Sequence, residues 1–457
     1  MTASAPVEQI GRKQDIDEPL TYGHVLAVSL PIVLSNVTTP LLGVTNTAVI
    51  GQLGEAHLIG AVGIGATIFT LLFWAFGFLR MGTTGLTAQA SGAGDRAETV
   101  ATLSRALLIA AIAGCALILL QKPLAWLCFT LIEGSAAVDA EARGYFTIRI
   151  WSAPFALANY ALLGWFIGLG KTRIGLYLQL LLNGANIALN LLLVSVLGWG
   201  VSGVAIGTVV AEALAAGFGV WLALRESGAP MAALALRLSF DRDGLLRMMA
   251  VNGDLMVRTL SLLFAFTFFT AQAARAGDVI LAANQVLLLF LNMSSYLLDG
   301  FAFATEVFTG RAIGAVQRER FRDAVRLSSV WAIGIAALAS LLYAVGGGAI
   351  IDAVTTNADV RETARLYLPW AAAAPIMGVA CFQLDGIFIG ATRTREMRNM
   401  ALLSLAIFLV AWAMLTPGFG NHGLWAALMV LFAARAVTLA AYLPRLLRGA
   451  FPQAHRA

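Results

Sequence analysis

Carboxylates interrupt several long apolar segments in the second half of the chain. Asp254, Asp299, Glu306 and Asp385 lie within such segments or just beyond them. A charge at the centre of a membrane helix costs roughly 2.5–3.5 kcal/mol on insertion scales, so each of these acids needs a partner or a function. Asp299 and Glu306 share a helix face if their segment continues past residue 303. We treat the four acids as candidates for binding a proton or another coupling cation, with Asp385 as the best member.

The same residues allow a structural interpretation. Asp254 and Arg258 are four apart on one helix face, so they are expected to form an ion pair. A neutralised network centred on Arg258 would then hold the helices together. The helix directions place Asp254, Asp299 and Asp385 in the cytoplasmic half of the bilayer, where the three can converge. The sequence leaves the structural and the cation-binding interpretations open.

The first half differs, because its segments 24–51 and 174–197 carry amides and hydroxyls and no acid. The candidates for a polar site or cavity there are Asn36, Thr39, Asn46, Asn159, Asn186 and Asn190. Such groups line a wet cavity, hydrogen-bond between helices, or offer carbonyl oxygen to a cation. Helix packing and a functional cavity remain equally open.

Four prolines are placed to bend membrane helices, because proline frees a backbone carbonyl and permits a kink. They are Pro31, Pro40, Pro154 and Pro375. Two further charges, Glu212 and Arg435, stand alone in their segments and are expected to be structural hydrogen-bonding groups. The three cysteines show no paired spacing, so we expect no metal site and no cofactor other than the coupling ion.

Twelve apolar segments must position these residues. The chain is 59% apolar and 12% charged, against roughly 25% charged in a soluble domain. Each segment has about the 20 residues that span a bilayer. They lie near 24–51, 58–79, 101–121, 145–169, 174–197, 201–224, 249–275, 279–303, 327–351, 366–390, 399–416 and 422–444. The expected fold is an all-α polytopic membrane protein.

Basic residues indicate the orientation. Of 30 Lys and Arg, four lie inside spans or at their ends, and 21 fall on the side of the two termini. The opposite loops carry five, namely Lys122, Arg143, Arg275, Arg361 and Arg365. By the positive-inside rule both termini are cytoplasmic, and the expected location is a bacterial-type inner membrane.

The chain contains an internal duplication. A shift of 222 residues places Gly92-Ala93 on Gly314-Ala315 and Phe166-Ile167-Gly168 on Phe388-Ile389-Gly390. Because each half has six spans, the repeat is parallel, as in transporters whose path runs between halves. The expected divisions are a tail 1–23, a first lobe 24–224, a linker 225–248, a second lobe 249–444 and a tail 445–457.

One apparent nucleotide motif has a simpler explanation. Gly198 to Gly203 and Gly418 to Gly423 both read as GxGxxG. The motif binds dinucleotides only after a strand within a βαβ unit, whereas both copies here join apolar helices. They are interpreted as tight turns, and no nucleic-acid partner is expected.

Several motifs together resemble the multidrug and toxic compound extrusion (MATE) family, and more narrowly its DNA-damage-inducible, DinF-type branch. They are Pro40-Leu-Leu-Gly-Val-Thr-Asn-Thr-Ala-Val-Ile-Gly51, Phe78-Leu-Arg-Met-Gly-Thr-Thr-Gly-Leu-Thr-Ala-Gln-Ala90, Leu298-Asp-Gly-Phe-Ala-Phe-Ala-Thr-Glu306 and Leu384-Asp-Gly-Ile-Phe-Ile-Gly-Ala-Thr-Arg393. The resemblance covers essentially residues 20–445.

The resemblance implies an H⁺- or Na⁺-driven antiporter that exports amphipathic, often cationic small molecules by alternating access. The expected partners are these small molecules and membrane lipid, and a monomer is expected. The resemblance also implies that Asp385 matches the family's second-lobe acid. Family members commonly have aspartates at the positions of Asn46 and Asn190, so this chain departs from the pattern there. Two alternatives stay open: a flippase of lipid-linked precursors on the same superfold, and an intramembrane enzyme. Scattered arginines count against the first and missing catalytic motifs against the second.

Overall fold

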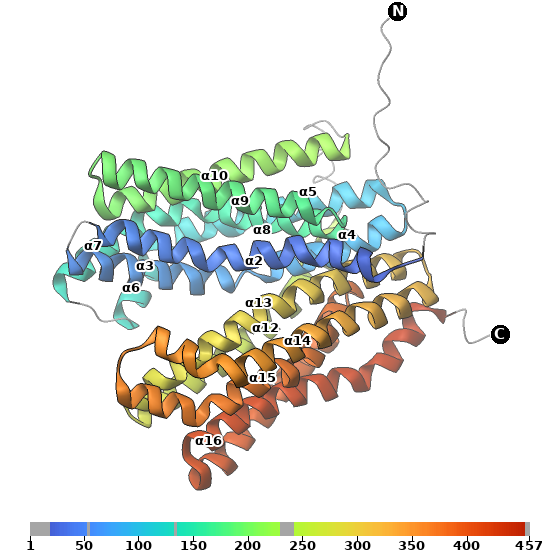
Figure 1. Cartoon of the computed structure of the whole chain (residues 1–457). Coiled ribbons are helices and arrows are strands. Elements are labelled where there is room, and N and C mark those ends of the chain that lie inside the picture. Colours follow the sequence, from blue (N-terminus) through green and yellow to red (C-terminus); the bar gives the residue numbers. More distant parts are fainter. Residues whose placement is uncertain (1–18, 53–54, 132–134, 229–241, 453–457) are drawn as a thin grey trace, which may run out of the picture.

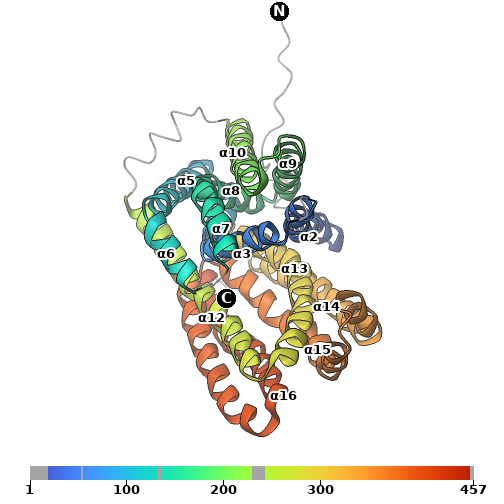
Figure 2. The same cartoon turned by 90° about the vertical axis from the view of Figure 1, so that its left-hand side faces the viewer.

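The computed structural model describes residues 19–52, 55–131, 135–228 and 242–452, and these are helical with no strand among them. Ten of the described helical segments are long and apolar enough to cross a membrane, and a shorter apolar helix covers Tyr22–Thr38. The last long segment folds back at Gly420 and therefore supplies two passes (Figure 2). Together these give the predicted twelve spans, so the all-α polytopic fold is confirmed.

The first half of the chain forms one bundle (Figure 1). Its elements are α2 (Tyr22–Gly51), α3 (Ala56–Trp74), α4 (Phe78–Gly92), α5 (Arg96–Leu119), α6 (Gln121–Leu131), α7 (Ala136–Arg149), the 3₁₀ turn η1 (Ile150–Ser152), α8 (Ala153–Gly168), α9 (Thr172–Asn190), the π-helical turn η2 (Leu191–Val196) and α10 (Gly200–Ser227). We call this set the first bundle.

The second half forms another bundle, which lies beside the first in both views (Figures 1 and 2). Its elements are α12 (Arg242–Arg275), α13 (Asp278–Gly314), α14 (Arg318–Val354), α15 (Ala358–Gly390) and α16 (Thr394–Ala450). We call this set the second bundle. The helices α10 and α12 extend into the predicted linker 225–248, whose residues 229–241 lie outside the described part.

The backbone repeats at the predicted offset. Gly94 and Gly170 adopt left-handed conformations with φ of 71° and 65°. The residues 222 positions later, Val316 and Thr392, adopt the same conformation with φ of 57° and 52°, although neither is a glycine. In each turn an N–H bonds back five residues to a helix carbonyl, as from Asp95 to Ala90 and from Gln317 to Ala312, which is the Schellman end of a helix. The second half therefore keeps turn geometry that its residue types disfavour.

The two bundles meet at one end and diverge at the other (Figure 1). They meet at the end where both described termini lie, through α4 and α13. A methyl group on Gly92 would lie 2.1 Å from Arg311 O, and one on Gly314 would lie 2.0 Å from Gln89 O. Only glycine allows helices to approach this closely.

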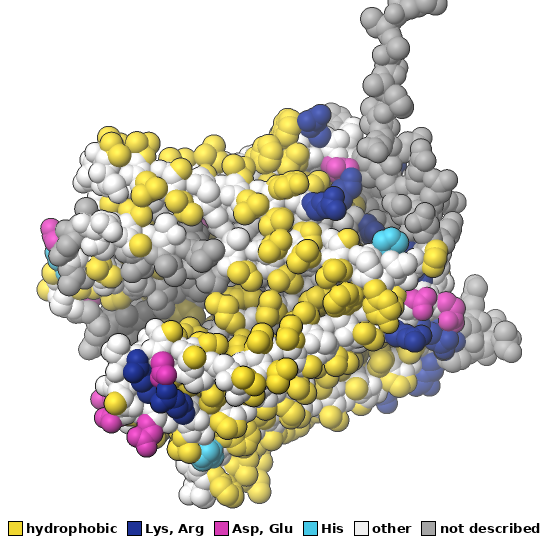
Figure 3. Space-filling view, in the orientation of Figure 1, with side chains coloured by type: hydrophobic (Ala, Val, Ile, Leu, Met, Phe, Trp, Pro, Cys, Tyr) yellow, Lys and Arg dark blue, Asp and Glu magenta, His cyan; other side chains and the backbone are white. Residues whose placement is uncertain are grey.

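The visible surface is divided into zones (Figure 3). Apolar side chains cover the middle of the molecule, as expected for a lipid-facing surface. Lys and Arg gather at the end of the termini, with a smaller charged group at the other end of the second bundle. The latter end carries Asp352, whose carboxylate pairs with Arg365 at 2.6 Å and Arg361 at 3.5 Å.

Candidate ion-coupling site

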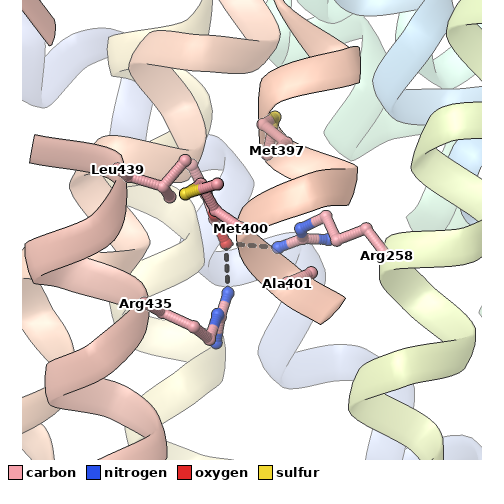
Figure 4. A pocket seen from close by; sticks show the side chains of 7 residues that line it. Arg258, Met397, Met400, Ala401, Arg435 and Leu439 are labelled. Atoms are coloured by element: carbon pink, nitrogen blue, oxygen red, sulfur yellow. Dashed lines mark hydrogen bonds and ion pairs between the residues drawn. The ribbon is translucent and has the colours of Figure 1, made fainter. Parts of the chain in front are cut away.

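Asp385 is the centre of a buried ion cluster in the second bundle. It lies on α15, where Gly386 packs so close to α13 that a methyl group would be 2.3 Å from Ala302 O. Arg435 of α16 and Arg258 of α12 both donate to the same carboxylate oxygen, Oδ2, and the Arg435 contact is 2.5 Å long. Figure 4 shows the two guanidinium groups reaching that oxygen from opposite helices. All three residues are at most 8% exposed.

The predicted ion pair between Asp254 and Arg258 is wrong. The Asp254 carboxylate instead accepts from Arg398 at 2.7 Å and from the Thr394 hydroxyl at 3.1 Å, both near the start of α16. Arg258 instead turns inward and shares the Asp385 carboxylate with Arg435, because a deeply buried carboxylate needs direct partners to offset its desolvation. Spacing along one helix could not show that partners on neighbouring helices were closer.

The other two acids, Asp299 and Glu306, both lie on α13. This helix continues past residue 303 to Gly314, which is the condition under which the two acids share a helix face. The charges around Asp299 are Arg80, Arg258, Asp385 and Arg435. The structure therefore brings Asp299 and Asp385 into one group of charges, whereas Asp254 is held apart by Arg398.

Arg80 is the contribution of the first bundle to this group of charges. It lies on α4, and its guanidinium covers the Phe303 ring at 3.8 Å from the ring centre. Its charged neighbours include Glu306, Asp299 and Arg258. Cation–π contact of this kind holds the arginine at the surface where α4 meets α13. The group of charges therefore spans the two bundles.

The first bundle contains a connected amide network in place of acids. Asn190 donates to Asn46 Oδ1 at 2.7 Å and to Asn186 Oδ1 at 2.8 Å. Asn186 in turn donates to the Thr208 hydroxyl at 2.8 Å. All four side chains are at most 7% exposed. The network joins α2, α9 and α10, so three of the predicted polar residues do converge.

The remaining predicted amides lie elsewhere. Asn36 donates to Tyr296 O at 3.3 Å and so links α2 to α13 of the other bundle. Asn159 donates to Glu212 O at 3.1 Å within the first bundle. The side chain of Thr39 lies outside the described part of the chain.

The predicted bending prolines have different settings. Pro154 lies in the first turn of α8, directly after the 3₁₀ turn η1 that separates it from α7. Pro31 and Pro375 lie inside continuous helices, α2 and α15. The side chain of Pro40 is not among those described. Only at Pro154 does the helix change type.

Sequence reasoning missed three arginine contacts. Arg435, predicted to be a lone structural group, binds Asp385, and Arg80 contacts Phe303 of the other bundle. Arg149 forms a two-pronged ion pair with Glu212 at 2.6 and 3.0 Å. A single charge within an apolar segment was the available signal, since each required a partner on another helix. Within the described ranges no three or more His, Cys, Asp or Glu side chains group together to hold a metal ion.

Comparison with known proteins agrees with this geometry. The MatE family pattern matches residues 31–192 and 255–415, which are two blocks in corresponding parts of the two bundles. Crystal structures of MATE transporters share the fold: one in the bent conformation superposes with a TM-score of 0.83 at 18% identity, over 94% of this chain and 97% of that one. The chain therefore belongs to the MatE family and is a multi-pass membrane transporter rather than an enzyme.

Among curated proteins, the chain is 41% identical to DNA damage-inducible protein F of Escherichia coli, over 91% of this chain and 90% of that protein. It is 25% identical to the probable multidrug resistance protein NorM of Rhizobium meliloti, over 95% and 96%. These matches confirm the resemblance to the DinF-type branch. Membership of this bacterial family also implies an inner-membrane location.

Proposed function

We propose that this chain exports amphipathic, cationic small molecules across the inner membrane in exchange for inward-moving H⁺ or Na⁺. The observation that carries the proposal is Asp385, a membrane-buried acid held by Arg258 and Arg435 where three helices of one bundle meet. A carboxylate at such a depth changes its contacts when a proton or cation binds, and that change can bias a bundle between two conformations.

The different packing of the bundles at the two ends of the molecule supports alternating access. At the end of the termini, the close crossing of α4 and α13 leaves no room between the bundles. At the other end the bundles diverge (Figure 1). If the basic end is cytoplasmic, as the positive-inside rule requires, the bundles are closed against each other toward the cytoplasm and diverge toward the outside (Figure 1). Transport then requires α4 and α13 to move apart, so that the cytoplasmic end opens.

The substrate class rests on the relatives. NorM of Rhizobium meliloti is described as a probable multidrug resistance protein, and MepA of Staphylococcus aureus as a multidrug export protein. Partly exposed Asp299 gives the chain a carboxylate that can attract a cationic substrate. No described feature favours a flippase, and we propose that the protein acts as a monomer in lipid.

Flux into proteoliposomes tests the proposal. Transport of a fluorescent cationic dye is measured with a pH gradient alone, with a Na⁺ gradient alone, and with neither. We expect one gradient to drive transport in the native protein and Asp385→Asn to abolish it while dye binding persists. Dye transport that ignores both gradients would overturn the proposal.

Asp352→Asn is the matched control. Asp352 also pairs with two arginines of its own bundle, but its side chain is 40% exposed at the end away from the termini. We expect this variant to transport at the native rate. A loss equal to that of Asp385→Asn would show that disrupting any ion pair of the second bundle stops transport, and that Asp385 has no special role.

A further inference from the structure

Glu306 is a fully buried acid with little support from its surroundings. Its side chain is 0% exposed, and neither carboxylate oxygen has a hydrogen-bond partner among the described residues. The Thr84 hydroxyl faces it, but donates its own proton to Arg80 O at 2.9 Å. Asp385 and Glu212, by contrast, each bind arginine directly. A buried ionised carboxylate without donors carries a cost that the neutral acid avoids.

The position of Glu306 in the duplication is unusual. Thr84 and Glu306 are 222 residues apart, so they are equivalent positions of the two halves. The next equivalent pair toward the termini, Ala88 and Gly310, is also in contact: a methyl group on Gly310 would lie 2.7 Å from the Ala88 methyl carbon. Helices α4 and α13 therefore cross so that equivalent residues face each other.

Small residues seal Glu306 from the end where the termini lie. Beyond Ala88 and Gly310 come Gly92 and Gly314, each of which touches the backbone of the opposite helix. We call the contact formed by Ala88, Gly92, Gly310 and Gly314 the glycine seam. While the seam is closed, water cannot reach Glu306 from that end. When α4 and α13 separate, the carboxyl group lies at the newly opened surface.

Charged groups lie near Glu306 on its own helix and on neighbouring helices, and α15, which also packs against α13, carries Asp385. Helix α4 contributes Arg80, α12 contributes Arg258, and α13 itself contributes Asp299. Arg258 is bound to Asp385, and the Arg80 guanidinium lies over the Phe303 ring, with no ion pair to Glu306 within 4.0 Å in the described part of the chain. The Arg80 guanidinium therefore contacts an aromatic ring and does not pair with the Glu306 carboxylate.

We propose that Glu306 is a proton-binding site gated by the glycine seam, which carries a proton while the seam is closed and releases it to the cytoplasm when the seam opens. On opening, the carboxyl O–H bond breaks, its electron pair stays on oxygen, and the proton passes to water. Arg80 then faces a hydrated carboxylate. Reloading comes from the other end, through Asp299, which is partly exposed and seven residues earlier on α13. The inference rests on the proposed function and specifies H⁺ as the coupling ion.

Infrared spectroscopy of the purified protein in lipid discs tests the protonation directly. A protonated carboxyl group gives a C=O stretching band that an ionised one lacks. We expect Glu306→Gln to remove one such band from the native spectrum. Glu212→Gln is the control, because both Glu212 carboxylate oxygens bind the Arg149 guanidinium directly and its loss should leave that region unchanged. An unchanged band in Glu306→Gln would overturn the proposal.

Transport supplies the second measurement. In proteoliposomes, Glu306→Gln should lose uptake driven by a pH gradient, while dye-for-dye exchange without a gradient continues. Native-rate uptake by this variant would refute the Glu306 site, yet leave the exporter function standing. Absence of gradient-driven uptake in the native protein would instead refute the proposed function. If Glu306→Gln does not fold, Glu306→Asp should keep pH-driven uptake with a shifted C=O band, and an unshifted band would count against the proposal.

Discussion

Gln89 of α4 and Arg311 of α13 are equivalent residues of the two halves, and each reaches the end of a helix in the opposite bundle. Gln89 donates to Gly390 O at 2.8 Å and to the Thr392 hydroxyl at 3.2 Å, beyond the end of α15. Arg311 donates to Leu169 O, at the end of α8. The last carbonyls of a helix have no partner within it, so each side chain satisfies one of them across the boundary. Two reciprocal contacts thus hold the bundles together beside the glycine seam.

Removing these contacts should loosen the closed end. A hydrogen bond from a charged donor contributes about 1.5–3 kcal/mol and one from a neutral donor about 0.5–1.5 kcal/mol. We therefore expect Arg311→Ala to increase hydrogen–deuterium exchange at the ends of α4 and α13 more than Gln89→Ala does. Arg322→Ala, which breaks only a surface pair with Glu319, is the control. Equal exchange in all three variants would show that the reciprocal contacts do not hold the bundles.

The glycine seam should tolerate no added methyl group. At Gly314 a methyl would lie 2.0 Å from Gln89 O, which forces α4 and α13 apart. We expect Gly314→Ala to favour the state opened toward the termini, so that a thiol introduced by Ser91→Cys in a background without native cysteines reacts faster. At Gly334 of α14 a methyl meets nothing within 4 Å, so Gly334→Ala should leave the reaction rate unchanged. Slow labelling in both variants would contradict this account of closure.

The sequence predicted the spans because hydropathy and length are local properties, and it predicted the duplication because Gly314 and Gly390 recur at a fixed offset. It also selected Asp385, since a charge in an apolar segment is costly wherever its partner lies. Polarity within apolar segments singled out Asn46, Asn186 and Asn190 as candidates, but their convergence between α2 and α9 depends on packing that the sequence does not record.

The partners of the buried charged side chains were less predictable from the sequence than the spans were. Asp254 and Arg258 have the spacing of an ion pair, but a long arginine side chain reaches a neighbouring helix as easily as its own. The choice of Asp385 over Asp254 depends on how the helices pack, which one sequence does not record. For the same reason Arg435 seemed solitary, although it lies at 2.5 Å from Asp385.

The shared carboxylate oxygen of Asp385 should make its loss costly for stability as well as for coupling. Asp385→Asn leaves Arg258 and Arg435 without their anion, and breaking a buried pair costs about 3–5 kcal/mol. The double variant Asp385→Asn with Arg435→Met removes one uncompensated cation and should regain part of that stability. Thermal unfolding in detergent measures both. A double variant less stable than Asp385→Asn would show that Arg435 supports the fold independently of the acid.

That double variant should still be unable to couple transport to a gradient. Its partly regained stability would separate the two roles of Asp385, because a protein that folds but shows no gradient-driven dye transport has lost coupling for a reason other than unfolding. Recovery of gradient-driven transport in the double variant would move the coupling function away from Asp385. Glu306 of α13 would then be the buried acid left to couple transport to the gradient.

The amide network of the first bundle leads to a prediction about pH. Asn46 Oδ1 accepts from Asn190, whose two N–H groups are both used within the network. An amide does not titrate, so the arrangement of α2 and α9 should stay the same between about pH 4 and 8, the range in which carboxyl groups and histidines change charge. Asparagine has nearly the shape of a neutral aspartic acid, and we infer that the first bundle is held in the geometry of the protonated acid.

Asn46→Asp should bring back a response to pH. Neutral, the new side chain accepts the same hydrogen bond from Asn190 and leaves the network intact. Ionised, it places a charge among groups that are at most 7% exposed, and α2 can relieve that charge only by moving toward water. Spin labels on α2 and α9 should therefore show a pH-dependent distance in Asn46→Asp and a constant one in the native chain. A native chain whose α2 already moves with pH would mean that another group performs the switch.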